Sequence, residues 1–447
     1  MAENCKYLSL EIDLQMTSLN KVPRTILIIN FHSSSNAGDA ALLETTIRQL
    51  QSSFRGVRFI VSANYPDDAY ARSLGVDLVA SPAAIVGLST KDSPLLQIFR
   101  MVIGLMASGL TALVPRIKRF IPKDWYNLLD AYQQADLVVS VPGNIFVTMG
   151  TFGWAFVVSA VSIFFALLFG KPLYIMPQSL GPVQRRWERF LLKWLYSRAQ
   201  IVFTREPVSF RLGQDLGLPH KKLRHTPDLG FGFSSLVGRD EALRILGRYD
   251  YALSPKPVGV TIINQPGGRL DRRHLARYYA VMADVLSEFV KNYSVTLYFF
   301  PQVTGPTSLE DDRIATRWVI DRMSVRSSVV FIDQPLSPAL LRTLFGLMEI
   351  FVATRMHSGI FAVTMGVPTL FIGYLSKTRG IVEDMGIQEW LLELDAIQDS
   401  LLWEKIEALW LQRHVVRQTL GQKVPFIIRQ TLQVGQQIAQ DYYSLKK

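Results

Sequence analysis

The chain has 447 residues, of which 49% are apolar and 19% charged, a globular balance that excludes an intrinsically disordered chain. The formal net charge of +11 favours anionic partners, namely phosphorylated small molecules, anionic lipid or nucleic acid. Nucleic acid is the weakest of the three, because the sequence has neither zinc-ligand spacing nor an aromatic RNA-binding signature. Cys5 is the single cysteine, which rules out an intrachain disulfide and fits a reducing, cytoplasmic compartment.

The first 24 residues mix acidic, basic and polar types and lack the apolar core of a signal peptide, so we predict a loose N-terminal extension over 1–24. From Thr25 onward, continuous apolar runs alternate with helical stretches, which is typical of parallel strands covered on both faces. In the first half of the chain the predicted strands are Thr25–Phe31, Val57–Ser62, Ala135–Val141, Pro172–Pro177 and Ala199–Thr204.

The second half repeats this alternation. Ser337 and Pro338 predict a helix start, with serine as N-cap and proline at the first helical position. The end of the chain, from about Ser400, is predicted to be helical and amphipathic. The predicted strands are Val258–Asn264, Ser294–Phe300, Val329–Asp333, Glu349–Thr354 and Pro368–Tyr374.

These elements predict an α/β fold with two Rossmann-like, doubly wound lobes, similar to the GT-B architecture of many glycosyltransferases. We place the N-terminal lobe at 25–240, with an apolar insertion at about 95–120, the C-terminal lobe at 256–395, and C-terminal helices at 396–447. In such sheets ligands bind outside the carboxyl ends of the strands, which is where candidate site residues are sought.

Two uncharged stretches raise the question of membrane contact. Gly150–Gly170 is about long enough to span a bilayer, but it lies between two strands of one alternating series, so we predict a buried helix. Met101–Pro115 is shorter and precedes three cations, Arg116, Lys118 and Arg119. For it we favour an interfacial helix or hairpin resting on the inner face of an anionic membrane, with plain core as the alternative.

The segment Val352–Ile387 holds the strongest candidates for chemistry. Arg355, Met356 and His357 come directly after a predicted strand, in the turn that opens the next helix. A helix N-terminus attracts anions, and an arginine fork beside an imidazole can hold a phosphate or carboxylate. Lys377 follows the next strand and is expected on the same rim. The alternative is that Arg355 and His357 only cap the helix and pair with acids.

Arg205 occupies the corresponding position in the other lobe, because it directly follows the strand that ends at Thr204. We expect it to face Arg355 across the cleft, while the alternative is a salt bridge with Glu206 or another nearby acid. For Asp311 and Asp312 we prefer an acidic helix start over a role in the cleft.

Weaker candidates for substrate hydroxyls follow other strands or lie in loops of the N-terminal lobe. Gly38 permits a tight turn and Asp39 is expected to cap the next helix, so Asn36 and Asp39 have a structural reading as well as a functional one. The full set of these candidates for binding substrate hydroxyls is Asn36, Asp39, Asn144, Gln178 and Asp228.

The order of the motifs NAGDAAL, QSLGP, TREPVS and TRMHSGIFAVTMGVPTLFIGYLSKTRGIVEDMGI resembles the polysaccharide pyruvyl transferase family over most of Thr25–Trp390. The last motif is the specific one. The resemblance implies that phosphoenolpyruvate is the donor and that a sugar diol of a surface polysaccharide or lipid-linked precursor receives a pyruvate ketal. It implies that Arg205, Arg355, Met356, His357 and Lys377 bind the donor, with His357 and Lys377 catalytic.

No metal-ligand cluster is visible in the sequence, so we expect neither a metal nor an obligatory cofactor. Two alternatives stay open. One is a nucleotide-sugar glycosyltransferase of the same two-lobed shape. The other is an inactive membrane-associated scaffold, suggested by the turn Val141–Asn144, which has one glycine where the family usually has a pair.

Overall fold

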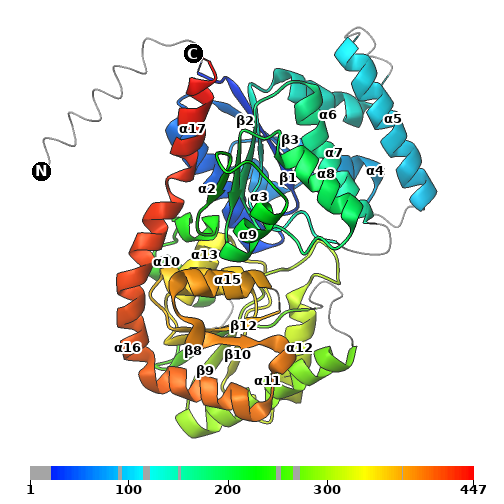
Figure 1. Ribbon diagram of the computed structural model, residues 1–447. Helices are drawn as coiled ribbons and strands as arrows, with labels where there is room; N and C mark the ends of the chain where they lie inside the picture. Colours follow the sequence, from blue (N-terminus) through cyan, green and yellow to red (C-terminus); the bar gives the residue numbers. More distant parts are fainter. Residues whose placement is uncertain are drawn as a thin grey trace, which may run out of the picture.

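The structure, a computed structural model, describes residues 22–88, 93–113, 121–148, 153–247, 253–264, 272–374 and 376–446. Two parallel β-sheets form two lobes, one above the other in Figure 1. The predicted N-terminal extension lies mostly outside the described residues, as do the cations Arg116, Lys118 and Arg119.

The N-terminal sheet has seven strands in the order β3-β2-β1-β4-β5-β6-β7, all parallel. Its strands are β1 Thr25–Phe31, β2 Arg58–Ala63, β3 Asp77–Ala80, β4 Leu137–Ser140, β5 Leu173–Gln178, β6 Ile201–Thr204 and β7 Leu223–His225. The helices of this lobe are α2 Ala37–Ser53, α3 Ala69–Ser73, α4 Pro82–Val86, α5 Pro94–Leu113, α6 Lys123–Gln134, α7 Trp154–Leu168, α8 Arg186–Tyr196 and α9 Pro207–Asp215.

The C-terminal sheet has six parallel strands in the order β10-β9-β8-β11-β12-β13. Its strands are β8 Pro257–Thr261, β9 Thr296–Phe299, β10 Val329–Phe331, β11 Ile350–Ala353, β12 Thr369–Gly373 and β13 Leu391–Glu393. Its helices are α10 Arg239–Gly247, α11 Arg272–Tyr293, α12 Asp312–Arg322, α13 Pro338–Phe345, α14 Met356–Thr364 and α15 Ser376–Met385. Short 3-10 turns are η2 Leu229–Gly232, η3 Gln388–Trp390 and η4 Leu394–Ala396.

Each predicted strand overlaps an observed one, and Ser337 caps α13 as predicted, its hydroxyl accepting from the Leu340 N–H at 3.3 Å. Three strands were not predicted, namely β3, β7 and β13. All three are three or four residues long and lie at a sheet edge. An edge strand is covered on fewer sides, so it carries a weaker apolar signal than a central one.

The two faces of the N-terminal sheet are covered by different helices. α4 to α8 pack on one face, where their apolar residues form a core with Leu27 and Ile29 of β1. α2 and α17 (Val434–Ser444) pack on the other, against Ile26 and Ile28. Figure 1 shows α5 to α8 together on one side of this lobe and α2 and α17 on the other.

The described part of the apolar stretch Gly150–Gly170 forms α7, a buried helix in the core of the N-terminal lobe, as predicted. Phe156, Ile163 and Phe165 are at most 1% exposed. Within the part of the chain that the structure describes, no helix is both long and apolar enough to cross a bilayer. The described part of the other apolar stretch, Met101–Pro115, belongs to α5.

Besides direct helix contacts, such as those of α13 with α2 and of α15 with α9, two connections join the lobes. The loop before α2 pairs with the loop after β9 through backbone hydrogen bonds, from Ala37 N–H to the Gln302 carbonyl at 3.0 Å and from Thr304 N–H to the Ser35 carbonyl at 2.9 Å. Farther along the chain, the long helix α16 (Asp399–Thr431) runs along the C-terminal lobe, and α17 crosses back to α2 (Figure 1).

Strand order reverses once in each sheet, between β1 and β4 and between β8 and β11. The loops at such a switch point diverge to opposite faces and leave a crevice at the carboxyl ends of the strands. The two crevices face one another, because the paired loops described above extend from these ends of β1 and β9. The fold therefore places loops from both lobes around one shared space.

Candidate functional site

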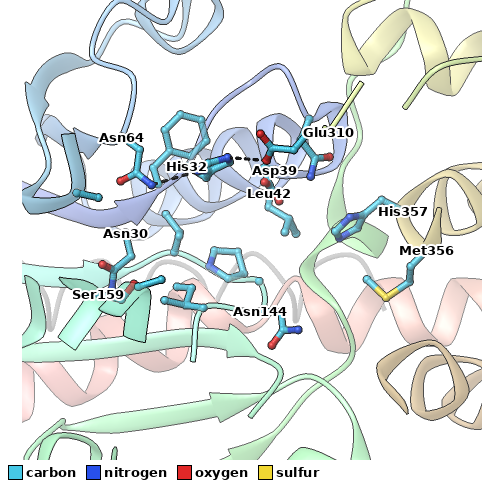
Figure 2. Close-up of a pocket in the computed structure, with 18 of the residues that line it drawn as sticks. Asn30, His32, Asp39, Leu42, Asn64, Asn144, Ser159, Glu310, Met356 and His357 are labelled. Atoms are coloured by element: carbon cyan, nitrogen blue, oxygen red, sulfur yellow. Dashed lines mark hydrogen bonds and ion pairs between the residues drawn. The ribbon is translucent and has the colours of Figure 1, made fainter. Parts of the chain in front are cut away.

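A cavity of about 620 Å³ occupies this space and is lined by residues of both lobes. In Figure 2, His357 and Met356 lie on one side of it and His32, Asn64 and Asn30 on the other, with Asp39 between them. Eight of the predicted site residues line the cavity: Asn36, Asp39, Asn144, Arg205, Arg355, Met356, His357 and Lys377. Gln178 and Asp228 do not line it.

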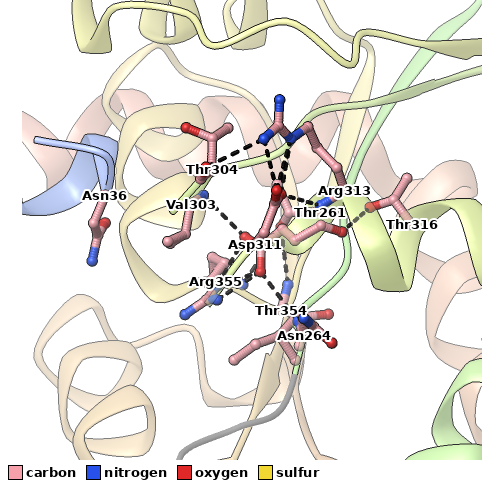
Figure 3. Close-up of polar contacts among 12 residues, drawn as sticks. Asn36, Thr261, Asn264, Val303, Thr304, Asp311, Arg313, Thr316, Thr354 and Arg355 are labelled. Atoms are coloured by element: carbon pink, nitrogen blue, oxygen red, sulfur yellow. Dashed lines mark hydrogen bonds and ion pairs between the residues drawn. The ribbon is translucent and has the colours of Figure 1, made fainter. Parts of the chain in front are cut away.

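Arg355 lies between β11 and α14 and is anchored by a buried carboxylate. Its Nε and one terminal nitrogen donate to the two oxygens of Asp312, at 3.0 and 2.6 Å (Figure 3). The same carboxylate accepts from the Asn264 and Val303 backbone N–H groups at 3.1 and 3.0 Å. Burial alone would lower the pKa of Arg355, but Asp312 raises it, so the guanidinium is a fixed positive charge.

Asp311 and Asp312 differ in role, which corrects the expectation of a simple acidic helix start for both. Asp311 does cap α12, accepting from the Arg313 N–H at 3.0 Å, and it pairs with the Arg313 side chain. Asp312 is fully buried and orients Arg355. Of these two neighbours, Asp311 caps the helix and Asp312 contacts Arg355, which lines the cavity.

Arg205 follows β6 and is 1% exposed. It donates to Asp228 at 2.7 Å and to the Ser179 hydroxyl at 2.8 Å, whereas Glu206 lies 3.7 Å away. Burial alone would raise the pKa of Asp228, but Arg205 holds it well below its usual range. Arg205 therefore forms a salt bridge with a nearby acid, Asp228, as the alternative interpretation expected. It also lines the cavity.

His357 lies at the first turn of α14, between the two lobes. Its Nε2 is 3.6 Å from Asp228, beyond hydrogen-bonding distance, and has no hydrogen-bond partner. Gly38 of the opposite lobe faces the ring, because a Cβ at that position would meet the imidazole Nδ1 at 2.3 Å. Asp228 thus lies next to both Arg205 and His357, and glycine at 38 makes room for the ring.

The start of α2 differs from the expectation. Asn36 is the N-cap, accepting from the Gly38 N–H at 3.0 Å, so the predicted cap role of Asp39 is wrong. Asp39 instead lies in the first helical turn and lines the cavity. Gly38 is inside the helix rather than in a tight turn, and its value is the space it leaves for His357.

Lys377, near the start of α15, has a lowered pKa. Burial, followed by the nearby Arg205, lowers its pKa to about 7, against the opposing effect of Asp39, Glu206 and Asp228. Its side chain can therefore change charge near neutral pH. The exposed Arg379, two residues further along the helix, pairs with Glu393 at 2.9 Å and does not line the cavity.

The neutral candidates separate into two groups. Asn144 lines the cavity, and its buried Oδ1 has no hydrogen-bond partner. Gln178 is fully buried and satisfied by Ser140, Val141 and Tyr196, so it holds the loop after β4 and is not placed to touch a ligand in this cavity. Such a satisfied amide inside a lobe rigidifies a core.

Gln302 lines the cavity and was not predicted as a site residue. Its side chain indicates a place where a ligand can bind. It is 2% exposed, and neither its side-chain nitrogen nor its oxygen has a hydrogen-bond partner. A buried amide without partners costs roughly 1–3 kcal/mol, a cost that a bound ligand removes. The side chain lies in a loop after β9, whose backbone is fixed by Ala37.

A second polar cluster was also missed. His32 pairs with Glu310 of the other lobe at 3.2 Å and contacts Asn64 through its other ring nitrogen at 3.1 Å (Figure 2). Burial alone would lower the pKa of His32, but the hydrogen bond to Glu310 and the charges of Asp39 and Glu310 raise it. Asn30 nearby adopts a left-handed φ of 66°, which is uncommon for a non-glycine residue.

The cavity therefore has two chemically distinct halves. One holds Arg205, Arg355 and Lys377 around His357, which suits a small ligand with more than one negative group. The other holds amide side chains, an aromatic ring and the His32–Glu310 pair, which suits hydroxyl groups. Position after a strand was the available signal for His32, Asn64 and Gln302, but the sequence analysis did not select these three residues.

Two parallel-sheet lobes with the site between them place the protein among α/β proteins of the GT-B fold. Solved structures show the same fold: HepE from Anabaena with UDP-glucose, at 14% identity and a TM-score of 0.57, covers 94% of this chain and 99% of its own. The UDP-GlcNAc 2-epimerase from Neisseria meningitidis with UDP-GlcNAc, at 12% identity and 0.58, covers 93% and 100%.

The chain belongs to the polysaccharide pyruvyl transferase family, whose model matches residues 36–376. It is also 21% identical over 403 residues to the amylovoran biosynthesis protein AmsJ of Erwinia amylovora, covering 86% of this chain and 91% of that protein. The match to the family includes Arg205, Arg355 and His357 and ends at the residue before Lys377.

Proposed function

We propose that the protein transfers pyruvate from phosphoenolpyruvate to a sugar diol, as a ketal, in the synthesis of an extracellular polysaccharide. The observation that carries the proposal is the convergence of Arg205, Arg355 and Lys377 on His357, in a chain of this family. Phosphoenolpyruvate is a small molecule that has a phosphate and a carboxylate on the same carbon. Two arginines and a lysine that is charged below neutral pH, drawn from both lobes, suit that charge distribution better than a single helix N-terminus does.

In the proposed reaction, one acceptor hydroxyl adds to the enol carbon while the methylene carbon takes up a proton and becomes a methyl group. The carbon–oxygen bond to phosphate then breaks, and the second hydroxyl adds to the same carbon. One hydroxyl proton ends on the methyl carbon and the other on phosphate, so atoms and charge balance. His357 beside Asp228 delivers the first proton, and Lys377 stabilises the leaving phosphate.

The acceptor lies in the other half of the cavity in this proposal. The His32–Glu310 pair and Asp39 are placed to accept protons from hydroxyls, and Asn64 and Asn144 to orient the sugar. Tyr65 offers an aromatic wall, packing edge-on against His32 at 5.6 Å between ring centroids. Asn36 and Gln302 lie at the boundary between the two halves, where the paired loops meet.

A donor panel tests the function. Titration calorimetry should give binding of phosphoenolpyruvate and none of UDP- or GDP-sugars, because the cations are grouped for a small anion. Arg355→Ala should weaken that binding by roughly one to two orders of magnitude. Arg379→Ala, an exposed arginine outside the cavity, is the matched control and should bind as wild type. Binding of a nucleotide sugar without binding of phosphoenolpyruvate would favour a glycosyltransferase instead.

The pH dependence of donor binding tests Lys377. A lysine of pKa about 7 is charged below neutral pH and loses its charge above it. If only the charged form holds the donor, affinity should fall about tenfold between pH 6 and pH 8 through this group. Lys377→Arg stays charged throughout and reports the titration of the ligand and other groups. Identical pH profiles for wild type and Lys377→Arg would exclude this role for Lys377.

A further inference from the structure

The helix α5 exposes most of its large apolar side chains, whereas a helix on the surface of a globular protein normally buries them. Apart from Met101, its buried face consists of small or polar residues, among them Gln97, Gly104 and Ser108. Gly104 packs so close to Trp125 that a Cβ there would meet the indole at 2.3 Å. Its outer face carries its large apolar residues, with Leu95 80%, Phe99 61% and Met106 63% exposed.

These residues form one stripe rather than scattered exposure. The exposed members recur at helical spacing, so they share a face of α5; they are Leu95, Leu96, Ile98, Phe99, Val102, Leu105 and Met106. Apolar side chains on a monomeric protein are normally scattered, and a continuous stripe marks a contact with a partner or a membrane. The stripe contributes nothing to the core of the N-terminal lobe.

The nearby helix α8 supplies the charge that identifies the partner. Trp187 and Phe190 are 41% and 70% exposed, and Arg186 and Lys193 lie exposed along the same helix, with Arg189 half-buried. Its one acid, Glu188, is fully buried and paired with Arg185. The outer face of α8 is therefore basic and aromatic without a compensating carboxylate from this helix.

Both helices belong to one side of the N-terminal lobe. Met101 and Ala107 of α5 and Leu192 and Leu195 of α8 share the core that covers one face of its sheet. Figure 1 shows α5 to α8 on that side of the lobe and α17 on the other. An apolar stripe and a basic, aromatic helix on one side match what an anionic lipid surface binds, with rings at the headgroup level and cations at the phosphates.

We propose that the outer faces of α5 and α8 form a docking surface for an anionic lipid bilayer. The protein lies on the surface and does not cross it. α7, which packs against α8, also lines the cavity through Ala155 and Ser159, so docking keeps the cavity close to the lipid surface. The proposal does not rest on the donor chemistry, and its test needs no turnover.

Flotation with vesicles tests it, using phosphatidylcholine alone or with about one third phosphatidylglycerol. The wild type should float with the anionic vesicles only. Replacing Arg186, Arg189 and Lys193 by glutamine should lower partitioning by a factor on the order of 10². Replacing Leu95, Phe99 and Met106 by serine should lower it by roughly tenfold or more, because apolar insertion is lost.

Matched controls lie on the C-terminal lobe and should float as wild type. For charge they are Arg277, Lys291 and Arg429 changed to glutamine, and for apolar exposure Leu411, Val415 and Phe426 changed to serine. Equal loss in patch and control variants would overturn the proposal, as would a wild type that does not float. A lipid-free dimer that the α5 serine variant dissociates would also overturn it, since the stripe would then bind a second copy.

Discussion

Replacement of His357 by glutamine is expected to slow turnover by a factor on the order of 10²–10⁴ while donor affinity changes little. Glutamine keeps a hydrogen-bonding group between Asp228 and the cavity but cannot act as a general acid or base. The position next to a buried carboxylate, at 3.6 Å, is what makes the imidazole suited to proton transfer. Single-turnover rates and donor affinity are measured for the same preparation.

His220→Gln serves as the matched control for this experiment, because His220 is exposed and does not line the cavity. It should turn over as wild type. If His357→Gln also turned over as wild type, proton transfer by His357 would be disproved. A parallel loss of donor affinity and rate would instead make His357 a ligand for the donor.

Replacement of Arg205 by alanine is expected to reduce the free energy of unfolding by about 3–5 kcal/mol, because it leaves Asp228 buried without its counter-charge. Donor affinity should fall as well, by roughly one to two orders of magnitude. Denaturant unfolding followed by tryptophan fluorescence gives the first quantity, and calorimetry gives the second.

A double variant separates these two effects. Arg205→Met combined with Asp228→Asn removes both charges, so most of the lost stability should return. Donor affinity should stay low, because the cation itself is missing. If the double variant regained both stability and wild-type donor affinity, Arg205 would be a structural residue only.

The strands were predictable because their signal is local: a central strand of a parallel sheet is apolar along its whole length. The same locality explains the correct reading of α7 as a core helix, since its place between β4 and β5 left no room for a membrane span. Edge strands such as β3 carry no such run and were missed. Position after a strand was enough to bring Arg205, Arg355 and Lys377 together, because the fold makes strand ends converge.

What the sequence did not reveal depends on contacts between distant residues. Asp312 looks like any acid at a helix start, and only the folded chain brings it 2.6 Å from Arg355. Gln302 has no sequence signature, because its importance comes from the absence of partners around its amide. Gly38 was read as a turn residue, although its role is to leave space for an imidazole that lies more than 300 positions later.

The return of α17 to the N-terminal lobe has a consequence for synthesis. Val434, Ile438 and Tyr442 are buried in the core formed by β1, β4 and α2, and Tyr174 of β5 donates to Asp441 at 2.8 Å. About 200 residues separate the last strand of that lobe from α17, so a ribosome needs on the order of 10–40 s to supply the helix. During that interval the part of this core that α17 covers stays open on the nascent chain. The N-terminal lobe is thus synthesised first but completes its core last. A chaperone that binds this lobe during translation would compete with α17 for the same apolar surface.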